Sequence, residues 1–124
     1  MKRLMLILTV LAIFVCVYFI QYTKEVEKYK STEEIICKIS TNKTYWISKI
    51  QICDSWGREI KLFCVSNRLE KIISSGSDGK YDTNDDIQGF VERNDGGWLL
   101  SIKWNYGLDS TYSHHGVYTT NEDL

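Results

Sequence analysis

The chain has 124 residues, of which 44% are hydrophobic and 13% aromatic, and its formal net charge is −1 at pH 7. This length predicts one domain rather than two, and the apolar content excludes a wholly disordered chain. Because there is no basic surplus, the composition argues against nucleic-acid binding, and we expect no nucleic acid among the partners.

The N-terminus carries an apolar segment, residues 4–20, that contains no charged side chain. Its 17 residues reach the length of a membrane span, and bulky residues such as Val15 and Tyr18 stand where a cleavable signal needs small ones. We therefore expect residues 1–21 to be an uncleaved signal anchor that crosses the bacterial inner membrane once. Lys2 and Arg3 precede the segment, which predicts a cytoplasmic N-terminus and a periplasmic or otherwise extracytoplasmic body.

Two other interpretations of this segment remain open. It could be a buried core helix, although no polar face interrupts it. It could also be a lipoprotein signal with Cys16 as the lipidated residue, although Val15 stands where that motif has a small residue.

Residues 22–53 are predicted to form a helical stalk and a connection. Val26, Tyr29, Ile36 and Ile39 follow helical spacing in part, so the helix should continue from the anchor to about residue 39, before turn formers at residues 40–43. Residues 45–53 are apolar and β-branched, and their pattern leaves helix and strand open.

The rest of the chain is predicted to be a small antiparallel sheet, which makes the fold class α+β. Residues 58–65 and 69–74 read as two strands of a hairpin with a short polar connection. Residues 87–91 and 98–104 read as two further strands around a turn at residues 94–97. No element is predicted after residue 104, and the last ten or so residues are expected to be loop or frayed tail.

The cysteines outside the anchor are Cys37, Cys53 and Cys64, an odd number in a compartment that permits disulfides. We expect Cys53 and Cys64 to pair and Cys37 to stay free or to pair between molecules. A zinc site is not expected, because there is no CxxC motif and the only two histidines, His114 and His115, are adjacent.

An acidic loop at residues 75–87 is the candidate site. Between residues 78 and 86 it carries four aspartates and one lysine, a balance of −3. Such a cluster needs a positive partner, and Ca²⁺ takes about 6–8 oxygen ligands from carboxylates, carbonyls and water. The EF-hand pattern is not met, because Lys80 stands at its third position and no glutamate closes the loop. A nearby Lys or Arg, or a solvated turn without an ion, are the alternatives.

The segment Asp54-Ser55-Trp56-Gly57, the strand pair, residues 73–80 and Asp85-Asp86-Ile87 together resemble the C-terminal domain of the major pseudopilin of type II secretion systems. The likeness covers about residues 54–87 and keeps order and spacing. It implies a pseudopilin-like β domain at residues 54–124 with Ca²⁺ in the acidic loop. The ligands that it implies are the carboxylates of Asp78, Asp85 and Asp86 and the carbonyls of Ser75 and Lys80.

The resemblance implies a non-enzymatic function: a calcium-stabilised structural or interaction component of protein secretion. Its expected partners are the cytoplasmic membrane, through residues 4–20, and other envelope or secretion proteins. No glycine precedes Gly57 and no glutamate lies in the apolar segment, so the prepilin peptidase motif of the family is missing and an unprocessed anchor is expected.

Two other functions are alternatives. One is a free-standing periplasmic binder or inhibitor of the immunity type, with an aromatic contact surface formed by Trp98, Trp104, Tyr106 and Tyr112. The other is a small hydrolase that uses Asp85 and Asp86 as acid and base. The shared environment of these neighbours argues against it, because acid–base pairs need separated pKa values.

Overall fold

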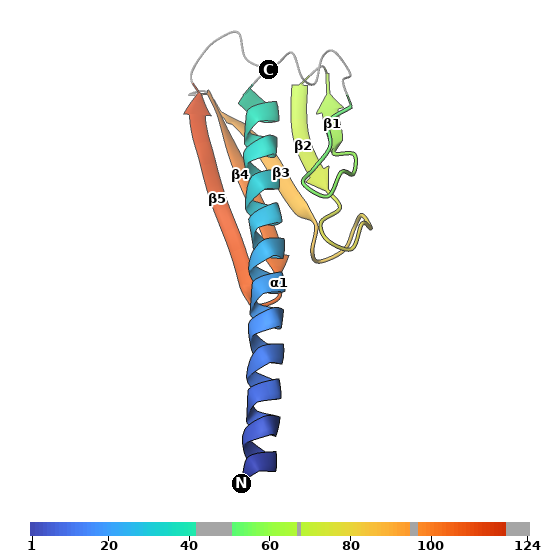
Figure 1. Ribbon diagram of the computed structural model, residues 1–124. Coiled ribbons are helices and arrows are strands. Elements are labelled where there is room, and N and C mark those ends of the chain that lie inside the picture. Colours follow the sequence, from blue (N-terminus) through green and yellow to red (C-terminus); the bar gives the residue numbers. More distant parts are fainter. Residues whose placement is uncertain (42–50, 67, 95–96, 119–124) are drawn as a thin grey trace.

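A single helix of 40 residues, α1 (Lys2–Thr41), runs from the N-terminus into the folded domain (Figure 1). The computed structural model describes residues 1–41, 51–66, 68–94 and 97–118. Within these ranges five strands follow the helix: β1 (Lys61–Val65), β2 (Arg68–Ser74), β3 (Ile87–Asn94), β4 (Gly97–Tyr106) and β5 (Asp109–Tyr118). They form one antiparallel sheet in chain order, as the α+β expectation requires.

The two halves of α1 lie in different surroundings. The N-terminal half stands alone below the sheet, and its apolar side chains are exposed (Figure 1). In the C-terminal half Tyr29, Thr32, Ile36 and Ile39 are buried, a spacing of three and four residues that places them on one face against the sheet. The helix ends at Thr41, close to the predicted end, and the hydroxyls of Ser40 and Thr41 donate to the carbonyl of Cys37.

One face of the sheet allows α1 to lie close to it. The register aligns Leu62, Ile72, Gly89 and Ile102 across four strands, so these residues share one face. A Cβ at Gly89 would lie 2.9 Å from Cγ2 of Ile36. The missing side chain at this position therefore lets α1 pack against the middle of the sheet.

The predicted β-hairpin and the two later strands are confirmed as β1 to β4. Residues 42–50 lie outside the described residues, and they include residues 45–50 of the stretch 45–53 for which helix and strand were both open. Residues 67 and 95–96 of the two predicted turns lie outside them too. The division of the chain at residues 21 and 53 stays a prediction, and α1 itself crosses residue 21 without a break.

The prediction of no element after residue 104 is wrong. Strand β5 pairs with β4 along its length, and the register Tyr106↔Asp109 leaves Gly107 and Leu108 as a two-residue turn. Among the described strands β5 has only β4 as a neighbour, and its sequence is rich in Ser, Thr, Tyr and His rather than in apolar residues. An edge strand of this kind lacks the hydrophobic alternation by which strands are recognised in a sequence.

The predicted Cys53–Cys64 disulfide is also wrong, because both cysteines are free. Cys53 pairs with Glu59 across a tight turn, and the chain then runs on through β1. Cys64 is five residues beyond Glu59, about 16 Å of extended chain at about 3.3 Å per residue. The Cα atoms of a disulfide lie within about 7 Å of each other, so the pair cannot be bridged in this fold. Cys37 is free as well and packs beside the core.

The core lies between α1 and the sheet, and aromatic residues make up its lower part. Trp104 is 1% exposed, and its ring stacks on Tyr29 with centroids 4.9 Å apart. Its indole N–H donates to Glu33 at 2.9 Å, which satisfies the polar atom of an otherwise buried side chain. Trp98 is buried too, so neither of these tryptophans offers the contact surface expected of a free-standing binder.

Candidate metal centre

The turn at residues 54–58 is held by one buried carboxylate. Asp54 is 5% exposed, and its Oδ1 accepts hydrogen bonds from the amides of Trp56 and Arg58, both at 3.0 Å. Its Oδ2 accepts one from the hydroxyl of Ser74 at 2.7 Å. Hydrogen bonds to a charged acceptor are the stronger kind, so Asp54 joins this turn firmly to the end of β2, where the acidic loop begins.

The same turn is attached to α1. The amide of Ser55 donates to Thr32 at 3.1 Å, and the indole N–H of Trp56 donates to Glu25 at 3.1 Å. The rings of Trp56 and Tyr29 meet edge to face with centroids 4.8 Å apart. The Asp-Ser-Trp-Gly segment is therefore the piece that connects the helix to the base of the acidic loop.

The acidic loop brings three of the predicted ligands together. Oxygen atoms of Asp78, Asp85 and Asp86 lie within 4.8 Å of one another. Asp85 accepts hydrogen bonds from the amide of Asp78 at 2.9 Å and the hydroxyl of Ser77 at 3.2 Å. Backbone amides thus fix where these carboxylates point. Asp82 is exposed and is not part of the group.

Asp86 and Asp78 are held by the backbone in the same way. Asp86 Oδ2 accepts from the amides of Asp82 at 2.7 Å and Thr83 at 3.3 Å. Asp78 Oδ1 accepts from the amide of Lys80 at 2.8 Å. Because amide donors orient the carboxylates, the group is preorganised rather than dependent on flexible side chains.

Thr83 lies at the centre of this group, and the sequence analysis missed it. Its Oγ1 is 2.9 Å from the carbonyl oxygen of Lys80, 3.0 Å from Oδ1 of Asp86, and in contact with Oδ1 of Asp85. A hydroxyl has one proton and donates one hydrogen bond at a time. The three oxygens are therefore alternative acceptors of one proton, and a cation among them would offset the negative charge of the two carboxylates.

Thr83 had a signal in the sequence. Thr83-Asn84-Asp85-Asp86 places a hydroxyl three residues before a carboxylate, the spacing of a capping box, in which the acidic side chain accepts from the amide of the hydroxyl residue. The bond from the Thr83 amide to Asp86 is that interaction.

The two neighbouring aspartates have pKa values that differ in direction. Burial raises the pKa of Asp85, but hydrogen bonds from Thr83, Asp78 and Ser77 outweigh it and leave the pKa below its ordinary value. Burial dominates for Asp86, and its pKa lies above the ordinary value despite hydrogen bonds from Thr83 and Asp82. Of the two carboxylates, Asp86 is thus the one whose charged form a nearby positive charge would stabilise more.

The positive side chain beside the loop does not neutralise these carboxylates. Arg58 donates from Nη1 to the carbonyl of Gly76 at 2.6 Å and lies 3.4 Å from that of Ser77. Among residues 1–41, 51–66, 68–94 and 97–118, no lysine or arginine forms an ion pair with any of the three aspartates. Arg58 thus binds carbonyl oxygens of the loop rather than its carboxylates.

The two residues predicted to contribute carbonyl oxygens differ in their surroundings. The carbonyl oxygen of Lys80 accepts a hydrogen bond from the hydroxyl of Thr83, which also contacts Asp85 and Asp86. Ser75 is 1% exposed at the start of the loop, and its hydroxyl has no hydrogen-bond partner in the described part of the chain. The candidate metal ligands in the loop are all oxygen atoms, and Ca²⁺ prefers such hard ligands.

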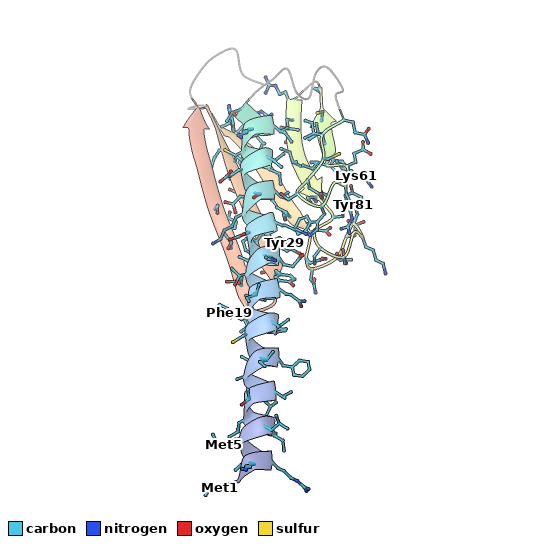
Figure 2. The ribbon with its side chains drawn as sticks, viewed as in Figure 1. Met1, Met5, Phe19, Tyr29, Lys61 and Tyr81 are labelled. Atoms are coloured by element: carbon cyan, nitrogen blue, oxygen red, sulfur yellow. The ribbon has the colours of Figure 1, made fainter. Side chains whose placement is uncertain are left out.

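Tyr29 connects the loop to the helix and carries a pH-dependent prediction. Its hydroxyl accepts from the amide of Ser77 and donates to Ser77 Oγ, both at 3.1 Å, and burial raises its pKa above the ordinary 10.0 although these bonds lower it. Figure 2 shows Tyr29 at the level of the loop. Because the folded-state pKa is raised, the stability that Tyr29 contributes is present below pH 10 and is lost as the pH rises through that pKa.

Tyr29→Phe should therefore shift the alkaline unfolding midpoint of the full chain in detergent to higher pH. At neutral pH the same variant should lose about 1 kcal/mol, the value of a typical hydrogen bond. The measurement is circular dichroism across an alkaline titration. Tyr112→Phe is the control, because Tyr112 is 59% exposed. An unchanged alkaline midpoint in Tyr29→Phe would contradict the prediction.

The resemblance of residues 54–87 to pseudopilins stays an expectation from the sequence. No protein-family model, no curated protein and no solved structure matches the chain.

Proposed function

We propose that this chain is a single-pass membrane protein whose pseudopilin-like, calcium-stabilised domain acts outside the cytoplasm as a structural component of protein secretion. It works by contact with other envelope or secretion proteins and catalyses no reaction. The N-terminus lies in the cytoplasm and the sheet domain in the periplasm.

The observation that carries the membrane part of this proposal is the division of α1 into an unburied apolar half and a packed half. The helix is long and apolar enough to cross a membrane, and none of its most apolar stretch is buried. Apolar surface costs about 25 cal/mol per Å² in water, so residues 4–20 need a bilayer or other helices around them. A domain fixed to the continuation of that helix is held at the membrane surface.

The acidic loop supports the calcium part of the proposal. One oxygen of each of three aspartates lies within 4.8 Å of the others, and the hydroxyl of Thr83 contacts two of these carboxylates. The residues that would hold the ion are Asp78, Asp85 and Asp86, with carbonyls of Lys80 and Ser75. The ion would supply positive charge that fixes the loop between β2 and β3, a structural role.

The acidic pair is poorly arranged for hydrolysis. Asp85 and Asp86 both contact the hydroxyl of Thr83, so no substrate atom can lie between their near oxygens. The polar cavity beside Asp86 has a volume of about 140 Å³, much smaller than the roughly 300–1,000 Å³ typical of ligand sites. A structural role for these carboxylates therefore remains the better proposal.

Deleting the gene in its own bacterium tests the secretory role. We expect secreted proteins to accumulate in the periplasm and to decrease in the medium, measured by quantitative proteomics of both fractions. The full chain should restore secretion, whereas residues 22–124 behind a cleavable signal peptide should not, because that form lacks the anchor. Unchanged amounts in the medium after deletion would overturn the secretory role.

A further inference from the structure

A cavity of about 360 Å³ lies where α1 leaves the apolar segment. It is lined by α1 side chains from Tyr18 to Lys28 and by Tyr106 of β4. We propose that this cavity, which we call the rim pocket, binds the phosphate of an anionic phospholipid in the bilayer that holds the anchor. The inference goes beyond the secretory role and rests only on the membrane anchor of the proposed function.

The depth of the rim pocket matches that of lipid headgroups. The apolar segment ends at Ile20, and α1 continues without a break through the pocket. At about 1.5 Å per residue, Gln21 to Lys28 cover about 10 Å above the hydrocarbon, and the headgroup layer is roughly 5–8 Å thick on each side. Figure 2 shows Phe19, which follows the lining residue Tyr18 in α1, below the sheet.

The length of the anchor draws the domain toward the bilayer. Residues 4–20 span about 25 Å as a helix, and the hydrocarbon core is about 30 Å thick. A span that is too short pulls its flanking residues toward the interface. The pocket and the β4–β5 turn beside it therefore lie at the membrane surface rather than above it.

The β4–β5 turn beside the pocket has an exposed apolar residue at its tip and lies against α1. Leu108 at its tip is 100% exposed, and the turn is fixed to the helix, because its amide donates to the hydroxyl of Tyr22 at 3.3 Å. The rings of Tyr22 and Tyr106 stack with centroids 5.4 Å apart. A Cβ at Gly107 would lie 2.6 Å from the Tyr22 ring, so the turn approaches α1 as closely as the backbone allows. Tyrosines are enriched at the depth of lipid headgroups, and an exposed leucine is favoured in the hydrocarbon below them.

The charge of the rim pocket fits a phosphate. Two lysines and one glutamate line it, and Lys28 is 3.4 Å from Glu25. Within the described ranges Lys24 has no ion-pair partner, so it offers an unpaired ammonium group to an anion, whereas the hydroxyl of Tyr22 already donates to Asp109. A phosphodiester of the surrounding leaflet is the anion that is always present at this depth, which favours lipid over a soluble ligand.

The test uses the full chain in nanodiscs of phosphatidylcholine with and without phosphatidylglycerol, and native mass spectrometry to count the lipids that stay bound. We expect phosphatidylglycerol to be retained in preference. Lys24→Gln should reduce that preference about fivefold, since a lysine at an anionic surface contributes an attraction of that size. Lys24→Gln and Lys28→Gln together should reduce it further. Circular dichroism should show the fold of Lys24→Gln unchanged.

Lys30→Gln is the matched control, because Lys30 is exposed on the same helix and does not line the pocket. An equal loss in Lys30→Gln would assign the effect to overall charge and overturn the pocket. Displacement of the lipid by inorganic phosphate would overturn the lipid as ligand, and a dimer with the same stability in both lipids would assign the surface to a second copy. Insertion without a lipid preference overturns this inference alone, whereas failure to insert overturns the anchor as well.

Discussion

Removing calcium with a chelator should lower the melting temperature of the full chain by about 10–20 °C. A ligand that binds only the folded state at 100 times its Kd stabilises it by about 2.7 kcal/mol, and each kcal/mol shifts the melting temperature of a domain of this size by roughly 4–8 °C. Asp78, Asp85 and Asp86 are the carboxylates whose charge the ion would balance. Differential scanning calorimetry in detergent, with calcium and with chelator, measures the shift.

Asp85→Asn should abolish this calcium response, because it keeps the shape of the side chain and removes a charge at the centre of the group. Asp82→Asn is the matched control. Asp82 lies in the same loop but is exposed and outside the group, and asparagine tolerates the positive φ of 65° at this position. We expect Asp82→Asn to respond to calcium like the wild type. Identical melting curves of the wild type in calcium and in chelator would rule out the ion as a structural component.

Gly76→Ala should destabilise the domain by about 3 kcal/mol and abolish the calcium response. Gly76 has a φ of 68°, and a Cβ there would lie 2.2 Å from the carbonyl oxygen of Asp85 and 3.2 Å from its Oδ2. The left-handed conformation costs a residue with a side chain roughly 1–2 kcal/mol, and overpacking adds about 1–3 kcal/mol. Because the clash is with backbone, the loop must move, and Asp85 moves with it.

Gly57→Ala separates the cost of the left-handed conformation from the cost of overpacking. Gly57 has a similar φ of 77°, but nothing lies within 4 Å of a Cβ built there. Its alanine variant should therefore lose only the conformational term, about 1 kcal/mol, and should keep its calcium response. Urea denaturation of both variants measures the difference. Equal losses at the two positions would show that Asp85 is not packed against Gly76 as described.

Much of the fold could be predicted from local patterns. The apolar run of the anchor, the helical spacing of Tyr29 and Ile36, and the short connection after Val65 each follow from residues close together in the chain. These predictions agree with α1 and with the β1–β2 hairpin. Strand β5 could not be predicted in this way, because its pairing with β4, rather than its own composition, makes it a strand.

The candidate site shows the same limit. The run of aspartates predicted a group of carboxylates, and three of the four lie together. Which one stays outside depends on the course of the loop, where Gly76 and Asp82 both have positive φ. The contribution of Thr83 depends on distances of about 3 Å to residues three positions away on either side, and a residue pattern gives candidates for such contacts but not their geometry.

The unbroken helix has a mechanical consequence. The chain has no proline and its first glycine is Gly57, so no residue of α1 is a usual source of a kink, and the helix is expected to transmit displacement like a stiff shaft. A displacement of the anchor along its axis would therefore be transmitted to the sheet. Inserting one residue between Ile20 and Tyr22, where the packing of α1 on the domain begins, would raise the domain by about 1.5 Å and turn it by about 100° relative to the membrane segment. The orientation of the whole outer part is thus set by the number of helical residues between these two positions.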